Sequence, residues 1–499
     1  MNKKNILIWL IFGIIMLVSF RISQARSLSM HFADEEDHIT IARYTNRGFK
    51  LYQEIQSNHQ PIVYFSSAKL QQLLDPPNIF MLIRRHRQAM FIYGLIWSGI
   101  ILWRFKAVGL IFITLFEFLK YWLFGNLWLM ESFAIYPSVY LFGVMLEAWF
   151  EKVRISTLEI IFLSFNSFLI IFSLVPLWPW LALTWLLIFI KIKKKIMVAG
   201  ISLLVITGLF FAISTYSPID WFIRTIYNNF VYAIPELSPF HGSVDYLRMI
   251  FFPFLAYFTV NSLQAQFISL FFTGYLVACW FKPKLLWLYL FLLLANNRVL
   301  SPVSVYYEGF HLLPWMGLMI FTFSYSLQKI KFKLWFIWLI WALILMLNNN
   351  MPYFWKTDPN YEYYVNYSTF DDFNFALKTI NKNGQKMAIS VLTNEILIQW
   401  KTLLDPATKQ IVCYPWENLI PELKQNRDQV FSLDNPFPPE FIYGSIDKQL
   451  TKAKYQVLYR NDKASELFIR KDIFDQISPE EWIALKTRGF ESTINEKKN

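Results

Sequence analysis

The chain has 499 residues, of which 55% are hydrophobic and 19% aromatic, and its formal net charge is +12. So apolar a composition excludes an ordinary soluble globular protein. The two cysteines, Cys279 and Cys413, lie far apart and provide no disulfide framework. Because the basic residues gather in short segments between apolar runs, we interpret the positive charge as a signal for membrane orientation and expect no nucleic-acid partner.

Apolar runs near the length of a membrane span recur along residues 1–350. They predict an α-helical polytopic membrane protein with about eleven transmembrane helices. The first run, residues 5–20, is followed by no convincing signal-peptidase site, so we expect an uncleaved anchor. The second and third spans are expected near residues 88–103 and 107–124.

Clusters of lysine decide the predicted orientation. The clusters at residues 3–4, 191–195, 282–284 and 329–333 all fall on the same side of the membrane if there are about eleven spans. This places the N-terminus in the cytoplasm and most of the remaining ionisable residues outside. We therefore expect a multi-pass protein of the plasma or inner membrane, in contact with membrane lipids, whose active face is extracytoplasmic.

The composition changes after residue 350, where the chain becomes polar and mixed. Helix-like spacing of apolar residues alternates there with short strand-like runs. These runs are 387–392, 410–414, 455–459 and 467–469. The alternation predicts a soluble α/β domain. We therefore divide the chain into a transmembrane domain, residues 1–350, with an extracytoplasmic loop at 21–88, and an extracytoplasmic α/β domain, residues 351–499.

A run of four carboxylates, Asp34-Glu35-Glu36-Asp37, follows the first apolar run. Four such groups beside a membrane span are costly unless they face water or a bound cation. We therefore expect them at the mouth of a polar cavity at one membrane surface. The segments Gly48-Phe49-Lys50-Leu51-Tyr52 and His59-Gln60-Pro61 follow in the same loop. The alternative interpretation is a solvated acidic loop without a ligand.

An Asp-Glu pair after the first span, then a Gly-x-x-Leu-Tyr turn, then a His-x-Pro element resembles the lipid-dependent membrane glycosyltransferases of the C-type (GT-C) fold. The nearest groups are the protein O-mannosyltransferases and the bacterial aminoarabinose transferases. The resemblance implies transfer of a sugar from a polyprenyl-phosphate donor to a lipid, protein or glycan acceptor. It implies Asp34 as the general base, with Glu35 supporting it or holding a divalent metal ion. His59 stands where many relatives have Pro-Pro, so we expect a different backbone there and take His59 as a candidate substrate-binding residue.

Glu131 is the second candidate catalytic carboxylate. It begins the predicted fourth span at its outer end, where members of the resembled family carry an acidic residue opposite the first-loop pair. An isolated glutamate at the edge of a span is functional by default in a membrane protein. We therefore consider Glu131, with Glu35, as a ligand of the implied metal ion. The alternative is a structural charge at a helix N-terminus, favoured by the helix dipole.

Arginines just outside the predicted second span oppose the charge rule. Arg84, Arg85 and Arg87 lie on the side of the membrane where positive charge is disfavoured. Guanidinium groups bind phosphate in a bidentate manner, so these three arginines are candidates for binding the donor phosphate. The alternative is contact with ordinary lipid headgroups.

A polar rim is expected between the ninth and tenth spans, and it contains Arg298, Tyr307 and His311. The resemblance implies a tyrosine-rich, histidine-containing rim near the donor phosphate, so we assign these three residues to that phosphate. His311 has an alternative role as a structural histidine with its hydrogen bonds satisfied.

Two other classes of function compete with the glycosyltransferase interpretation. A transporter or flippase of a lipid-linked saccharide often shows two related halves, which we do not find, and here the carboxylates gather at one face. A membrane-anchored scaffold would bind a partner through its outer domain. In a scaffold, Asp34 and Glu131 are replaceable without effect.

Overall fold

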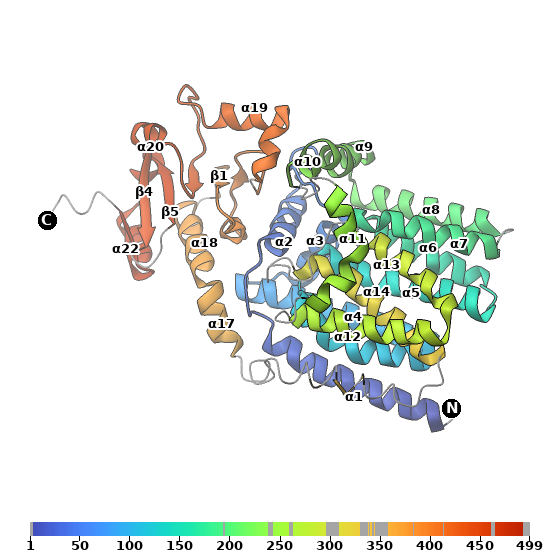
Figure 1. Ribbon diagram of the computed structural model, residues 1–499. Coiled ribbons are helices and arrows are strands. Elements are labelled where there is room, and N and C mark those ends of the chain that lie inside the picture. Colours follow the sequence, from blue (N-terminus) through green and yellow to red (C-terminus); the bar gives the residue numbers. More distant parts are fainter. Residues whose placement is uncertain are drawn as a thin grey trace.

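The computed structural model describes residues 3–192, 195–237, 243–258, 263–295, 309–329, 358–382, 384–412, 414–460 and 465–492, with the single positions 338, 340, 341 and 344. A bundle of long helices forms one part of the molecule, and a smaller domain with a sheet stands at one end of the bundle (Figure 1). The helices α2 (Ala33–Asn46) and α3 (Pro61–Leu74) lie between the two parts (Figure 1).

The chain is a multi-pass membrane protein, because seven apolar helices in the described part are long enough to cross a membrane. These segments are Ile6–Ala25, Ile79–Leu123, Met130–Glu151, Val175–Ile192, Ile196–Ser214, Gln264–Phe281 and Gly309–Gln328. Two shorter apolar helices are Thr157–Ile171 and Pro283–Ala295. The predicted number of spans is not confirmed, since the last expected span, between residues 333 and 348, lies largely outside the described residues.

The bundle consists of α1 (Lys3–Ala25), α4 (Ile79–Leu119), α5 (Met130–Leu146), α6 (Thr157–Ile171), α7 (Trp178–Ile192), α8 (Ile196–Ser214), α12 (Leu263–Phe281), α13 (Tyr289–Ala295) and α14 (Gly309–Lys329). Short helices α9 (Pro218–Phe222), α10 (Ile234–Leu237) and α11 (Ser243–Leu255) connect them. Every residue of α5 is buried, which makes it a central helix. In contrast, α8 exposes large apolar side chains such as Leu204, which is 73% exposed, as a lipid-facing helix does.

The helix α4 contains two spans joined by a sharp reversal. Lys106, inside it, has φ 52° and ψ −118°, which no helix accommodates. The hydroxyl of Ser98 donates to Glu117 Oε1 at 3.0 Å, although residues 19 apart in a straight helix are separated by about 28 Å. Gly109 permits the close approach, because a Cβ there would lie 2.7 Å from the carbonyl oxygen of Ile101. The predicted second and third spans are therefore the two arms of α4.

A buried ion pair joins several helices inside the bundle. Glu117, fully buried, accepts from Lys120 Nζ at 2.6 Å and from the hydroxyls of Tyr136 at 2.6 Å and Ser98 at 3.0 Å. The oxygen that accepts from Lys120, Oε2, also accepts from the Ser19 hydroxyl at 3.2 Å. Because an unpaired charge inside a membrane is costly, this network holds α1, both arms of α4 and α5 together.

Basic residues of separate segments meet at one end of the bundle. Arg104, near the reversal of α4, pairs with Glu147 and with Glu159, the latter at 2.7 Å. At the same end, Lys195 Nζ donates to the carbonyl of Ile155 at 3.0 Å. The α5 helix begins at the opposite end of the bundle, and its 17 residues span about 25 Å. Acidic α2 and the basic segments thus lie at opposite ends, which is the separation that the predicted orientation requires.

The C-terminal region contains a mixed sheet of six strands in the order β2-β1-β3-β5-β4-β6. Its strands are β1 (Ala388–Val391), β2 (Asp405–Pro406), β3 (Phe441–Tyr443), β4 (Tyr455–Arg460), β5 (Glu466–Arg470) and β6 (Phe490–Ser492). Its helices are α17 (Pro359–Asn366), α18 (Ser368–Ile380), α19 (Pro421–Val430), α20 (Lys448–Lys454), α21 (Lys471–Phe474) and α22 (Pro479–Thr487). Only β1 pairs in parallel, with β2 and β3, and the other pairings are antiparallel. The sheet confirms a C-terminal region of mixed helices and strands.

The predicted strand at 410–414 is wrong. In that segment Gln410 forms an isolated bridge with Gln56 of the first loop. Ile411 and Val412 are buried in the same apolar core as the membrane helices. These apolar side chains therefore pack in the core of the bundle, and the segment is not a strand of the sheet.

The first loop, expected as an extracytoplasmic segment at 21–88, is folded against both parts of the molecule. Trp400 Nε1 donates to Gln71 of α3 at 3.1 Å, and the Tyr44 hydroxyl of α2 donates to Gln399 at 2.9 Å. Ile39 of α2 is buried in one apolar core with the strands and helices of the C-terminal region. The beginning of α2 is therefore held at the junction of the bundle and the C-terminal region.

Candidate functional site

The first turn of α2 sends its carboxylates in different directions. The helix begins at Ala33, and Asp34, Glu35 and Glu36 lie in its first turn, where the helix dipole favours negative charge. Successive residues of a helix are rotated by about 100°. Asp34 is half-buried, whereas Glu35, Glu36 and Asp37 are buried. Asp34 is therefore the carboxylate of this run that is most accessible to solvent.

Glu35 and Arg87 form a buried ion pair with each other. Their side chains are 0% and 1% exposed, and Arg87 Nη2 lies 2.5 Å from Glu35 Oε2. Glu35 Oε1 also accepts from the backbone N–H of Trp128 at 2.9 Å. Arg87 donates further to the carbonyl of Met30 at 2.8 Å and to the hydroxyl of Tyr367 at 3.1 Å. The pair thus joins α2, α4 and the C-terminal region.

Among the described residues, Arg84 and Arg85 have other partners than this pair. The guanidinium of Arg84 lies 5.6 Å from the ring centre of Phe80. Arg85 is exposed and donates to Gln88 at 3.2 Å. Arg298 and Tyr307 lie outside the described residues. The three arginines of the predicted phosphate site therefore have three different environments.

Asp37, His38 and His59 form a compact group, hereafter the Asp-His-His cluster, in which Asp37 and His38 are buried and His59 is half-buried. His59 Nδ1 lies 3.1 Å from His38 Nε2 and 3.4 Å from Asp37 Oδ2. His38 Nδ1 lies 2.9 Å from the carbonyl oxygen of Trp128. Since a carbonyl only accepts, Nδ1 of His38 carries the proton and Nε2 presents its lone pair to His59. The Tyr64 hydroxyl donates to Asp37 Oδ2 at 3.2 Å.

The pKa values of the two imidazoles in the cluster are shifted in opposite directions. Burial lowers the pKa of His38, and the neighbouring His59 lowers it further. Burial also acts to lower the pKa of His59, but the hydrogen bond and charge of Asp37, with the charges of Asp34 and Glu131, outweigh burial and raise that pKa. Because Nε2 of His38 carries no proton, His59 Nδ1 donates the hydrogen bond between the two rings.

The predicted residues Glu131 and His311 meet beside the cluster. Glu131 opens α5 and is 1% exposed, and His311 lies in the first turn of α14. His311 Nδ1 is 3.3 Å from Glu131 Oε1. Both Asp34 and Glu131 act electrostatically on His59. The structure thus brings Glu131 and His311 into contact, and it places Asp34 and Glu131 close enough to His59 for their charges to act on its imidazole.

The C-terminal region also contributes residues to the site. The Tyr414 hydroxyl donates to Asp34 Oδ1 at 3.4 Å, and the ring of Tyr414 lies 6.4 Å from that of His59. Glu417 is 2% exposed and accepts from Gln410 Nε2 at 2.9 Å. Burial, with a smaller effect from Asp37, raises the pKa of Glu417 to about 7. The site is therefore closed on one side by the C-terminal region.

Sequence reasoning missed three residues of the site: His38, Tyr414 and Glu417. His38 had a local signal, because it directly follows Asp37 and both residue types bind metals. Tyr414 and Glu417 had none, because they approach Asp34 only through the docking of the C-terminal region.

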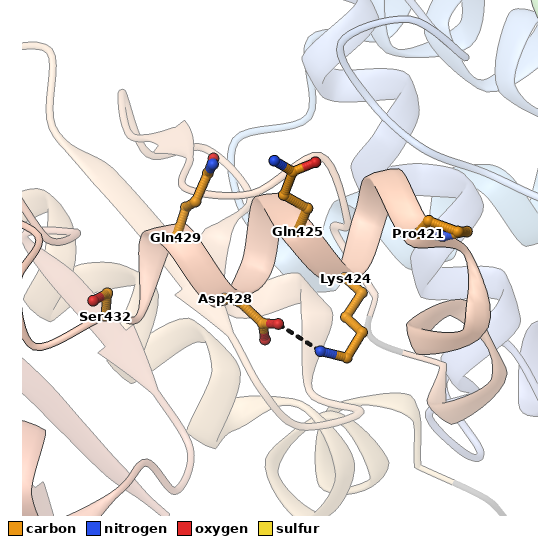
Figure 2. A pocket seen from close by; sticks show the side chains of 6 residues that line it. All are labelled: Pro421, Lys424, Gln425, Asp428, Gln429 and Ser432. Atoms are coloured by element: carbon orange, nitrogen blue, oxygen red, sulfur yellow. Dashed lines mark hydrogen bonds and ion pairs between the residues drawn. The ribbon is translucent and has the colours of Figure 1, made fainter.

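A separate hollow of about 500 Å³ runs along α19 on the surface of the C-terminal region (Figure 2). It is lined by Pro421, Lys424, Gln425, Asp428, Gln429 and Ser432. Lys424 and Asp428 pair there at 2.6 Å, and both side chains are 61% exposed (Figure 2). An exposed pair of this kind is typical of a solvated helix face. We therefore place the candidate site at α2, where the ionisable groups are buried and converge.

Comparison with known proteins finds no matching family model and no matching curated protein. The assignment of function therefore depends on the chemistry of the site and on the resemblance seen in the sequence. The site offers a half-buried carboxylate, a second carboxylate paired with a histidine, and a histidine beside a buried aspartate. Such groups can accept, donate and relay protons and can stabilise a bound cation or an oxyanion.

Proposed function

We propose that the protein is a membrane glycosyltransferase that moves a sugar from a polyprenyl-phosphate donor to an acceptor hydroxyl on the extracytoplasmic face. The observation that carries the proposal is the convergence of Asp34 from α2 and Glu131 from α5 around His59, at the end of a bundle of apolar helices. A polyprenyl chain needs an apolar environment, and its phosphate and sugar need a polar one. At this end of the bundle the apolar helices would contact the polyprenyl chain, and the carboxylates and histidines would contact the phosphate and the sugar.

Asp34 is the general base in this proposal. It is half-buried, so an acceptor can reach it, whereas its neighbours Glu35 and Asp37 are buried and engaged in pairs. Tyr414 donates a hydrogen bond to one oxygen of Asp34, which orients the carboxylate. The acceptor oxygen attacks the anomeric carbon, and its proton passes to Asp34. The bond between the anomeric carbon and the phosphate oxygen breaks, and polyprenyl phosphate leaves.

Glu131 and His311 serve the remaining groups of the reaction. His311 is 31% exposed in its side chain and lies beside Glu131, so the pair can present a positive imidazolium to the leaving phosphate. Glu131 positions the acceptor. Arg84, Arg85, Arg298 and Tyr307 are proposed as further contacts to the donor phosphate. Arg87, bonded to Glu35, instead holds α2 in the orientation that presents Asp34.

The test is transfer of a labelled sugar in proteoliposomes that contain the purified protein. A panel of polyprenyl-phosphate hexoses and pentoses is offered with a membrane extract as acceptor, and release of polyprenyl phosphate is measured beside product formation. Asp34→Asn is compared with Asp75→Asn, which alters an exposed aspartate of the same loop. Wild type and Asp75→Asn should transfer sugar at similar rates, and Asp34→Asn should transfer it far more slowly.

The same assay separates the competing functions. A flippase would change the side of the bilayer on which the labelled saccharide is accessible, without forming a glycosidic bond. A scaffold would do neither. The proposal fails if wild type consumes no donor of the panel, or if Asp34→Asn and Glu131→Gln both transfer sugar at the normal rate.

A further inference from the structure

We infer that the Asp-His-His cluster is a binding site for a borderline divalent transition metal, of which Zn²⁺ is the representative. Among the residues that the structure describes, Asp37, His38 and His59 offer ligand atoms that all lie within 4.8 Å of one another. Two imidazoles and one carboxylate are a recurrent ligand set for catalytic zinc and for related metals. The site is not the one expected from the sequence, which was built on Glu35 and Glu131.

The distances in the cluster are close to those of a metal site. Ligands bound to a tetrahedral zinc at about 2.0–2.1 Å are separated from each other by roughly 3.3 Å. The measured separations are 3.1 Å between His38 Nε2 and His59 Nδ1, and 3.4 Å between His59 Nδ1 and Asp37 Oδ2. The third pair, His38 Nε2 and Asp37, lies within 4.8 Å. Binding therefore requires release of the proton of His59 Nδ1 and an adjustment of these side chains around the ion.

The groups behind the ligands hold them in the orientation that a metal needs. His38 donates its Nδ1–H to the carbonyl of Trp128, which leaves Nε2 as the ligand atom. Metal-binding histidines usually donate the other ring N–H to a carbonyl or carboxylate in this way. Asp37 accepts from the Tyr64 hydroxyl, whose oxygen lies 2.5 Å from that of Ser57. The ligand atoms are therefore oriented before a metal arrives.

The neighbouring ion pair supports this arrangement and argues against the expected metal position. Glu35 Oε1 accepts from the N–H of Trp128, the residue whose carbonyl orients His38. Glu35 Oε2 accepts from Arg87. A cation at Glu35 would have to displace a buried guanidinium, whereas a cation at the cluster displaces only a proton. The cluster is thus the better cation site.

The charge around the cluster also favours a cation of this class. Asp34, Glu131 and Asp37 all act on His59 as negative charges. Nitrogen ligands select Zn²⁺ and its neighbours over Mg²⁺ and Ca²⁺, which prefer oxygen atoms alone. Three protein ligands leave a coordination position open for water or for an oxygen of a substrate.

The experiment measures metal binding without any sugar donor, so its outcome is separate from the proposed glycosyl transfer. The full chain in detergent is stripped with a chelator and dialysed against Zn²⁺, and bound metal is counted by plasma mass spectrometry. We expect about one Zn²⁺ per wild-type chain and a raised unfolding temperature, since a ligand of the folded state stabilises it. Bound Co²⁺ should give the visible absorption of a nitrogen- and oxygen-ligated ion.

Variants locate the ion. His38→Gln and His59→Gln should each weaken Zn²⁺ binding by more than the roughly 10- to 100-fold that loss of a group supporting a ligand costs. His31→Gln is the matched control, because His31 lies in the same loop beside Glu36, outside the cluster, and should bind as wild type does. Substoichiometric Zn²⁺ on wild type overturns the inference and leaves the cluster as a hydrogen-bonded proton site. Full binding by both His38→Gln and His59→Gln also overturns it, and the wild-type measurement decides the matter even where a variant fails to fold.

Discussion

Arg87→Leu should destabilise the protein strongly, because it leaves Glu35 buried without its counter-charge. In the structure the buried Arg87 donates to both oxygens of Glu35, to the carbonyls of Ser27 and Met30, and to the hydroxyl of Tyr367. Removing one partner of a buried ion pair typically costs about 3–5 kcal/mol. Among the described residues, Glu35 then keeps the N–H of Trp128 as its hydrogen-bond donor, which is one hydrogen bond for a full charge.

The double variant tests whether this cost comes from the unpaired charge. Replacing a buried pair by apolar residues of similar volume is often close to neutral, so Glu35→Leu with Arg87→Leu should recover much of the stability that Arg87→Leu loses. Arg85→Leu is the control, because Arg85 is exposed two residues earlier and its loss should change stability by less than about 0.5 kcal/mol. The measurement is the unfolding temperature in detergent, followed by intrinsic tryptophan fluorescence.

The same variants decide between the structural and the phosphate-binding role of Arg87. If Arg87→Leu unfolds at the wild-type temperature, the argument from the buried pair is refuted. If Arg87→Leu is stable and binds polyprenyl phosphate more weakly, the residue belongs to the donor site as the sequence suggested. A lower unfolding temperature that the double variant restores supports the structural role.

Three further predictions concern catalysis, pH and orientation. Asp34→Asn should lower the rate of sugar transfer by about 10²- to 10⁴-fold, the usual contribution of a general base, while donor affinity is retained; a normal rate would move the base elsewhere. Burial raises the pKa of Glu417 from 4.5 to about 7, so its proton binds more tightly in the folded state. The stabilisation, worth about 3 kcal/mol, is present in acid and is lost as the pH rises from about 4.5 to 7. Wild type should therefore lose more stability than Glu417→Gln between pH 5 and 8, and equal losses would contradict the burial argument. Alkaline phosphatase fused after Asn360 should be active and fused after Lys195 inactive, and the reverse pattern would place the site in the cytoplasm.

The class of the protein could be predicted from the sequence because it depends on local properties. The length of an apolar run and the position of a charge beside it can be counted along the chain. For this reason the sequence predicts Asp34, Glu131 and His311 as site residues without information on their partners. The mixed sheet at the C-terminus was expected on similar grounds, since β1, β4 and β5 have strand-like composition.

The partners of these residues could not be predicted, because each lies far away in the sequence. Arg87 follows Glu35 by 52 positions, and Tyr414 follows Asp34 by 380. The segment 410–414 was misread for the same reason, since its apolar residues pack against the first loop and the bundle. Which arginine faces a carboxylate and which faces outward is decided by helix packing.

The sequence by itself determined that this is a membrane protein with charged groups gathered beside its first and fourth spans, because the cost of burying polar groups acts on each segment separately. Only the tertiary structure decided which partner each of those charged groups contacts. A rotation of about 100° per residue turns Glu35 towards Arg87 and Asp37 towards His59. Adjacent carboxylates, equivalent in the sequence, thus become a structural ion pair and a candidate metal ligand.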